Sequence, residues 1–397
     1  MDNFHFHLYT DVLFGKGVEN HAGEMVKKHG GTKVLLVYGG GSVKKNGLYD
    51  RVVDSLNAEG IPFVDFGGVQ PNPLLSKAWE GVELANKEGC DFFLAIGGGS
   101  AIDTAKGIAL GVANPGVDFF ETYYINKVTP PKMMPVGTIH TITATGSEMS
   151  RSSVLRDEAN SRKQGFMHDP CRPVFALMNP EYTYTLPAYQ TAAGAADVFA
   201  HTLERYFYPA SSYLADAFGE AIMRNVVRVA PVALANPTDY ESHAELMLSG
   251  SFAHNDLAGL GHLNLGQEGS CHALERQMGG LFNTTHGAGL AMLMPAWVEY
   301  TAAHSEDKSQ YVKFATNVFG VEPDPEDDMK TITEGVRRFR AWVKEIGMPL
   351  TFKDMGIDHE GIELLIEKNA PAPGKTQGTR FPLTREDYAN IYFSVEK

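Results

Sequence analysis

Hydrophobic residues in the first half of the chain gather in short runs separated by stretches of helical periodicity. After a weakly alternating segment at 6–14, the runs fall at residues 33–38, 61–66, 91–96 and 174–178. Apolar runs of this length are typical of strands buried on both faces of a parallel sheet. Apolar positions spaced three or four apart, as at residues 46–58, predict crossover helices between them. The pattern therefore indicates βαβ units and an α/β domain.

In the second half the apolar spacing becomes helical almost to the end. We expect helices at residues 188–208, 213–235, 241–258, 288–304, 308–319, 329–347 and 360–369. Asn-Pro at 236–237 and Gly-Leu-Gly at 259–261 punctuate these stretches. A chain of 397 residues is also longer than a domain with a single hydrophobic core usually is. We therefore predict an α/β domain at 1–185 followed by an all-helical domain at 186–397.

A glycine-rich turn follows the strand predicted at 33–38. It contains Gly39, Gly40, Gly41 and Ser42, and Lys44 stands where a dinucleotide fingerprint would have its third glycine. Free N–H groups where a strand meets a helix suit the close approach of a phosphate. A bare tight turn fits the same residues equally well, so these residues alone do not decide whether the turn binds a nucleotide.

The residues around this turn favour NADP over NAD. No acidic residue ends the strand, where a carboxylate would bind a ribose 2′-OH and repel a 2′-phosphate. Ser42 and Lys44 could instead donate hydrogen bonds to that phosphate. Asp65, at the end of the next predicted strand, is the one candidate for an acidic residue that would favour NAD, and we interpret it as structural.

Two further stretches are candidates for cofactor binding. Gly97, Gly98, Gly99 and Ser100 follow the strand at 91–96 and open a helix, an arrangement that makes an anion site from backbone N–H groups and the helix dipole. The segment at 138–148 is rich in hydroxyl side chains. Its β-branched composition fits an edge strand, and its hydroxyls fit the lining of a cofactor site equally well.

Asp197 and His201 lie four residues apart in an Ala-rich stretch with helical periodicity. On a helix they point the same way, so both could bind one divalent metal. Taken alone, such a pair is more often a capping aspartate and a surface histidine. His272 and His286 are further candidates among 14 histidines, and spacing leaves His254 and His262 as rivals.

Charge and cysteine content narrow the class of protein. The net charge of −14 argues against a surface that binds a phosphate backbone, so we expect no nucleic-acid partner. The three cysteines, Cys90, Cys171 and Cys271, show no C-x-x-C pairing and indicate reduced thiols in the cytoplasm. We see neither a signal peptide nor an apolar run long enough to span a membrane.

Together these motifs resemble the iron-containing (group III) alcohol dehydrogenase family over nearly the whole chain. The resemblance includes FGKG at 14–17, GVQPNP at 68–73, GGGSAIDTAK at 97–106 and ATGSE at 144–148, followed by the Asp197…His201 and His272…His286 pairs. YGGGS at 38–42 and YTYTLP at 182–187 resemble the branch of butanol dehydrogenases and broad aldehyde reductases. The resemblance implies a dehydroquinate synthase-like architecture: a dinucleotide-binding α/β domain, a helical domain and a cleft between them.

The resemblance also assigns roles to residues of this chain. It implies one divalent metal, Fe2+ or Zn2+, on four ligands: Asp197, His201, His272 and His286. It places the cofactor pyrophosphate on Gly97, Gly98, Gly99 and Ser100, the nicotinamide near Thr138, Thr141 and Ser147, and the ribose near Lys163. The expected cofactor set is completed by Gly39, Gly40, Gly41, Ser42, Asp103 and Leu186. Members of the family usually act as dimers, so we expect a homodimer.

Two positions depart from the family pattern. Arg276 stands where relatives often have a second histidine, four residues after the third ligand, so a proton-relay role at that position is in doubt. Thr143 replaces a proline before the ATGSE motif, which changes a loop and removes no hydrogen-bond donor.

These observations predict an enzyme that interconverts short and medium-chain primary alcohols and aldehydes with NADP(H). Mixed nitrogen and oxygen ligands suit several divalent metals, and a fourth protein ligand weakly favours iron over zinc. One alternative is an NAD- and metal-dependent cyclase or lyase of the dehydroquinate synthase type. It would need several basic residues for a polyanionic substrate, and 194–208 and 262–290 contain only Arg205 and Arg276. The other alternative is a non-catalytic NADP-binding protein.

Overall fold

The chain forms two compact units. The computed structural model describes residues 1–160, 162–210 and 212–397. One unit spans His7–Tyr184, and the other combines Thr185–Lys397 with Met1–Phe6. The first six residues therefore group with the C-terminal unit, although the sequence placed them in the α/β domain. The backbone N–H of Asp2 donates a hydrogen bond of 2.8 Å to the carbonyl oxygen of Gly261, which ties them there.

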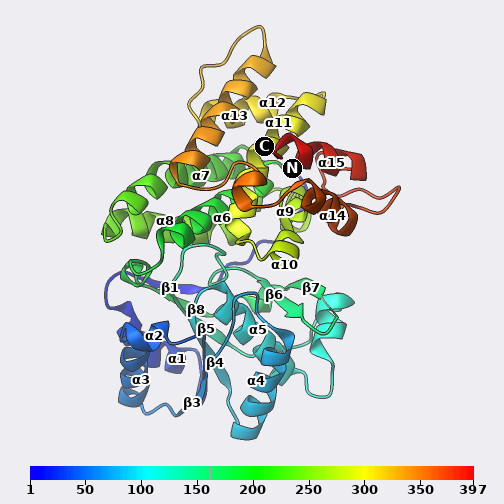
Figure 1. The fold of residues 1–397 in the computed structure, drawn as a ribbon. Helices are drawn as coiled ribbons and strands as arrows, with labels where there is room; N and C mark the ends of the chain where they lie inside the picture. The colour runs from blue at the N-terminus through cyan, green and yellow to red at the C-terminus, as the bar shows by residue number, and fades with distance from the viewer. Residues whose placement is uncertain (161, 211) are drawn as a thin grey trace. The chain divides into compact units, whose positions relative to one another are not determined.

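The predicted fold class is confirmed: a parallel α/β unit precedes a helical one (Figure 1). A six-stranded sheet in the order β1-β8-β5-β4-β2-β3, with every pairing parallel, forms the centre of the first unit. Its strands are β1 (Asp11–Phe14), β2 (Val34–Tyr38), β3 (Phe63–Phe66), β4 (Phe92–Gly97), β5 (Val136–His140) and β8 (Phe175–Met178). Its helices are α1 (Ala22–Lys28), α2 (Ser42–Lys45), α3 (Leu48–Ala58), α4 (Leu75–Glu88) and α5 (Gly99–Ala113).

Successive strand residues point to opposite faces of the sheet, so strands that are apolar throughout make both faces apolar. Helices cover both faces for this reason. On β2, Leu35 and Val37 pack into one core with α4 and α5, whereas Val34 and Leu36 pack into another with α1 and α3. Figure 1 shows these two pairs of helices on opposite sides of the strands. All five residues of β2 are buried, which explains its continuous apolar sequence.

The hydroxyl-rich segment contains an interior strand. Strand β5 lies between β4 and β8, so the edge strand, one of the two interpretations that the composition of this segment left open, is excluded. Its pairing ends at His140, and the remaining hydroxyl residues follow in a loop. The sequence analysis did not foresee the antiparallel hairpin of β6 (Ser152–Asp157) and β7 (Arg162–Met167). Its strands carry charged and polar residues and lack the apolar runs used to recognise the other strands.

The regular secondary structure described in the C-terminal unit is helical, apart from an isolated β-bridge between Gln377 and Leu383. Its α-helices are α6 (Ala188–Tyr206), α7 (Tyr213–Ala235), α8 (Tyr240–His254), α9 (Ser270–Glu275), α10 (Met278–Phe282), α11 (His286–His304), α12 (Ser309–Lys313), α13 (Asp328–Glu345), α14 (His359–Asn369) and α15 (Arg385–Ser394). Helix α6 is buried on every side from Thr191 to Tyr206 and packs against α7, α8 and α11. A helix buried all round is the centre of its domain, so polar groups on α6 need partners inside the protein.

Several helix boundaries differ from the predicted ones. Helix α8 ends at His254 because Asp256 adopts a left-handed conformation with φ of 73°, so the predicted continuation to 258 is wrong. The stretch predicted as one helix at 46–58 begins at Leu48, after a short helix that Gly47 separates with φ of 75°. None of the helices in the described part of the chain combines the length and apolar character needed to cross a membrane.

Candidate metal centre and cofactor-binding turns

Asp197 and His201 share one face of α6, as their spacing predicts. Nε2 of His201 lies 3.5 Å from Oδ1 of Asp197, and both side chains are almost fully buried. A carboxylate taken out of water in this way is costly unless it is paired with a cation or hydrogen-bond donors. The pair therefore requires a partner that the helix itself does not supply.

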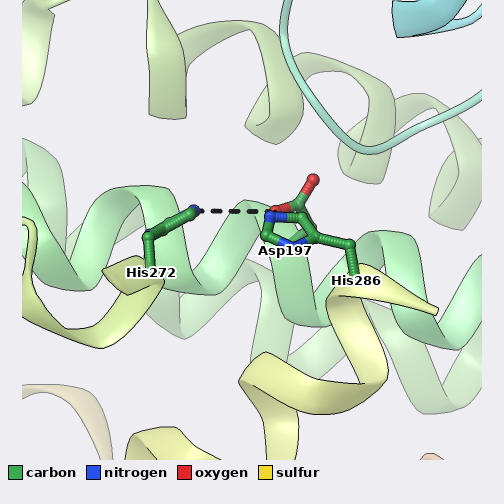
Figure 2. Close-up of side chains that lie close together, drawn as sticks. All are labelled: Asp197, His272 and His286. Atoms are coloured by element: carbon green, nitrogen blue, oxygen red, sulfur yellow. Dashed lines mark ion pairs between the residues drawn. The ribbon is translucent and has the colours of Figure 1, made fainter. Parts of the chain in front are cut away.

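Two further histidines reach the same carboxylate oxygen. His272 comes from α9 and His286 is the first residue of α11, and their Nε2 atoms lie 3.9 and 3.7 Å from Oδ1 of Asp197. Figure 2 shows both rings pointing from separate helices toward the aspartate. One ligand atom from each of these three residues lies within 4.8 Å of the other two, and His201 stands beside this group. The structure therefore brings all four predicted ligands around one oxygen atom.

A glycine allows α11 to approach α6 this closely. A Cβ atom on Gly287 would lie 1.9 Å from the carbonyl oxygen of Ala193, far inside van der Waals contact. Only a residue without a side chain fits there, and the same contact fixes the start of α11. His286, one residue earlier, is consequently held over α6 beside Asp197.

Buried carboxylates stand behind two of the histidines. Oε2 of Glu204 lies 2.8 Å from Nδ1 of His272, and Oε2 of Glu275 is hydrogen-bonded to Nδ1 of His286. The sequence analysis missed both glutamates. Glu204 follows His201 by three residues and Glu275 follows His272 by three, so each shares a helix face with a candidate ligand, but each contacts a histidine of another helix. Carboxylates in this position orient metal-binding histidines.

The residues fit a divalent metal. Oδ1 of Asp197 and Nε2 of His272 are buried, and within the described residues neither accepts or donates a hydrogen bond. Burial, with the neighbouring His254 and His272, lowers the pKa of His201 well below its usual value, so its ring is neutral and able to bind a metal. Three imidazole nitrogens and one carboxylate oxygen are donors that both Fe2+ and Zn2+ accept.

The rival histidines have different surroundings. The ring of His254 stacks on that of His201 with centroids 4.2 Å apart, so His254 borders the site. His262 is buried elsewhere, with Nδ1 2.9 Å from the carbonyl oxygen of Gly266 and its ring stacked on Tyr208. Arg276 follows the last residue of α9 and is exposed.

The second glycine turn opens α5 in the α/β unit. Gly98 is the N-cap of this helix, and a Cβ atom there would lie 2.1 Å from Cγ2 of Ile142. A Cβ on Gly99 would lie 2.6 Å from Oγ1 of Thr145. The hydroxyl-rich loop therefore packs directly against the glycines. The sequence foresaw the helix N-terminus but could not foresee this contact.

Several residues predicted to bind the cofactor make hydrogen bonds within the protein that stabilise the hydroxyl-rich loop and its strand. Oγ of Ser147 donates to Asp103 at 2.7 Å, and the buried Nζ of Lys106 donates to both Oγ and the carbonyl oxygen of Ser147. Thr138 is fully buried and its hydroxyl donates to the carbonyl oxygen of Phe175, 3.2 Å away. These side chains stabilise the strand and the loop, and their contact with a cofactor remains a prediction.

The first glycine turn is more open. Gly40, Gly41 and Ser42 are exposed, and a Cβ added to Gly40 would meet nothing within 4 Å. Asp65 accepts a hydrogen bond from the hydroxyl of Tyr49, with O–O distances of 2.7 and 2.8 Å to its two oxygens. This contact gives Asp65 a structural partner.

The remaining cofactor candidates lie outside both turns. Thr141 is half-buried in the hydroxyl-rich loop, and its backbone N–H donates to the carbonyl oxygen of Gly97 at 3.2 Å. Lys163 is exposed on β7 and donates to Oδ1 of Asn72 at 3.3 Å. Leu186 is half-buried before α6 and belongs to the helical unit.

Comparison with protein families covers almost the whole chain. Residues 10–180 match the family described as iron-containing alcohol dehydrogenase. Residues 191–395 match the family described as Fe-containing alcohol dehydrogenase, C-terminal.

Characterised relatives and solved structures agree with this match. The chain is 37% identical over 393 residues to NADH-dependent butanol dehydrogenase A of Clostridium acetobutylicum, covering 99% of both chains. It is 32% identical over 396 residues to the NADPH-dependent aldehyde reductase YqhD of Escherichia coli, again covering 99% of both. The structure of NADH-dependent butanol dehydrogenase A from Thermotoga maritima superposes with a TM-score of 0.92 at 37% identity, covering 100% of this chain and 99% of the other.

Proposed function

The chain belongs to the iron-containing alcohol dehydrogenase family and is an oxidoreductase of alcohols and aldehydes; from this premise we propose that it reduces short and medium-chain aldehydes with NADPH at a divalent metal held by Asp197, His201, His272 and His286. One observation carries the proposal. Three imidazole Nε2 atoms lie 3.5, 3.9 and 3.7 Å from the same buried carboxylate oxygen.

A divalent metal bound there would polarise the substrate oxygen, and a nicotinamide cofactor would exchange the hydride with the substrate carbon. The chain's own residues supply position and charge. Asp197 contributes the single negative charge among the four ligands, and the hydrogen bonds from Nδ1 keep the Nε2 atoms of His272 and His286 directed toward it. The side chain of His286 is 38% exposed and that of Asp197 only 5%, so His286 is the more accessible of these two candidate ligands.

The preference for NADPH rests on the first glycine turn. Gly40, Gly41 and Ser42, which follow β2, are exposed, and no carboxylate stands directly after the strand. Asp65, the carboxylate on the neighbouring strand, already accepts a hydrogen bond from Tyr49. Relatives use both cofactors, since two of the proteins above are named NADH-dependent and one NADPH-dependent.

The proposal extends to a homodimer working in the cytoplasm. Cys90, Cys171 and Cys271 are unpaired and buried, as expected of a protein from a reducing compartment. Burial raises the pKa of the Cys171 thiol to about 11, so this group stays protonated and unreactive at neutral pH. Light scattering on the purified protein that gave the mass of a monomer would contradict the dimer.

Steady-state reduction of butanal tests the proposal. After removal of metal and reconstitution with Fe2+ or Zn2+, we expect turnover that depends on metal, with kcat/KM at least about tenfold higher for NADPH than for NADH. A preference for NADH would refute the cofactor proposal alone. Full turnover after chelation, verified by metal analysis, would refute the metal proposal.

A further inference from the structure

We propose that Glu204 is a positioning residue that selects the tautomer of His272 and so decides whether this histidine can bind a metal. The inference rests on the metal site proposed above. Both oxygens of Glu204 contact His272: Oε1 accepts the backbone N–H at 2.9 Å, and Oε2 lies 2.8 Å from Nδ1 of the ring. The side chain of Glu204 is completely buried.

The first of these contacts replaces a helix cap. Helix α9 begins at Ser270, and its N-cap is Gly269, which has no side chain to accept the free N–H groups of the first turn. The N–H of His272 is one of these groups, and Glu204 accepts it from another helix. A backbone N–H can only donate, so the group that faces it must be an acceptor.

The second contact then sets the ring. An ionised carboxylate only accepts hydrogen bonds, so Nδ1 of His272 carries the proton. A neutral imidazole has one protonated nitrogen, which leaves Nε2 with its lone pair. Nε2 is the atom that faces Oδ1 of Asp197 at 3.9 Å. Glu204 therefore presents the metal-binding nitrogen of His272 to the centre.

Glu204→Gln reverses this arrangement while keeping the size of the side chain. The backbone N–H of His272 requires the amide oxygen, so the amide NH2 must face Nδ1. Nδ1 then becomes the acceptor, and the proton moves to Nε2, where it blocks metal binding.

Glu275→Gln is the matched control. Glu275 is also buried and contacts Nδ1 of His286. In the part of the chain that the structure describes, its side chain accepts no backbone N–H. The amide of a glutamine there can rotate so that its oxygen still accepts from Nδ1, and the tautomer of His286 is kept. Both variants remove one buried negative charge, so the comparison separates the tautomer from the charge.

Equilibrium binding of Zn2+ to the metal-free proteins tests the inference, with thermal unfolding of each metal-free variant as a check on folding. We expect Glu204→Gln to weaken Zn2+ binding about 10- to 100-fold more than Glu275→Gln does. Adding Glu204→Gln to His272→Ala should cause no further loss of affinity, because the glutamate acts through this ring.

The outcomes distinguish a failure of the role given to Glu204 from a failure of the proposed metal site. Equal losses in the two glutamine variants, or an additional loss in the double variant, would overturn the role of Glu204 and leave the metal site intact. Wild-type affinity in His272→Ala would instead show that this histidine is not a ligand, which overturns the proposed site and the inference with it.

Discussion

The first glycine turn has few side chains around it. Gly40 is exposed, and a Cβ at this position would meet no atom within 4 Å, so its substitution does not disturb packing. Ser42 starts α2 close by, and Lys44 lies on the same short helix with its ammonium group 4.3 Å from the centre of the Tyr49 ring. The electrostatic environment of the turn is therefore set by few side chains, which makes it easy to test.

Gly40→Asp should weaken the use of NADPH and spare that of NADH. A carboxylate beside a bound 2′-phosphate repels it, and at a distance of several ångströms this costs about tenfold in kcat/KM. Gly40→Asn is the control, since it has the same shape without the charge. Kinetics that show equal losses for both cofactors with Gly40→Asp would exclude Gly40 from the 2′-phosphate site.

At this scale the sequence predicted the four candidate ligands but not the two glutamates that are hydrogen-bonded to His272 and His286. Asp197 and His201 were detectable from their spacing, and His272 and His286 only through the family resemblance. Glu204 and Glu275 were missed because a glutamate in a helix is usually solvated. Which glutamate serves which histidine depends on how α6, α9 and α11 pack, and no local pattern records this.

At the scale of elements, the approach of α11 to α6 holds the candidate centre together. The Cβ that would clash at Gly287 meets backbone atoms of Ala193, which cannot move aside as a flexible side chain could. The close approach therefore requires a glycine at the start of α11. The two helices carry three of the four candidate ligands.

Gly287→Ala should therefore separate the helices and damage the site. We expect destabilisation of about 1–3 kcal/mol, as for overpacked cores, and weaker Zn2+ binding. Gly280→Ala is the control, because the nearest atom to its added Cβ is 4.0 Å away. Chemical denaturation and Zn2+ titration of both variants measure these effects. A Gly287→Ala protein with unchanged stability and Zn2+ affinity would show that the contact can relax.

Most elements were predictable where the apolar pattern was strong, and the errors have physical causes. The end of α8 depends on a left-handed Asp256, a conformation the residue type permits but does not require. The segment at 138–148 was ambiguous because its hydroxyl-rich composition suits an edge strand, yet β5, whose last three residues it includes, lies inside the sheet. The hairpin of β6 and β7 carries many polar side chains and gave no apolar signal.

At the scale of the whole molecule, each unit carries a different part of the proposed chemistry. The α/β unit contains both glycine turns, and the helical unit contains all four candidate ligands. The order of strands and helices along the chain indicated this division. The order of strands within the sheet was not predicted, because it depends on tertiary packing that apolar periodicity does not encode.

The most direct test of the account is the binding of Zn2+ to the metal-free wild-type protein and to Asp197→Asn. Asn keeps the shape of the side chain and removes the charge that three Nε2 atoms surround. We predict one equivalent of tightly bound Zn2+ per chain in the wild type and affinity at least about 100-fold weaker in Asp197→Asn. Equal stoichiometry and affinity in the two proteins would contradict the proposed metal centre.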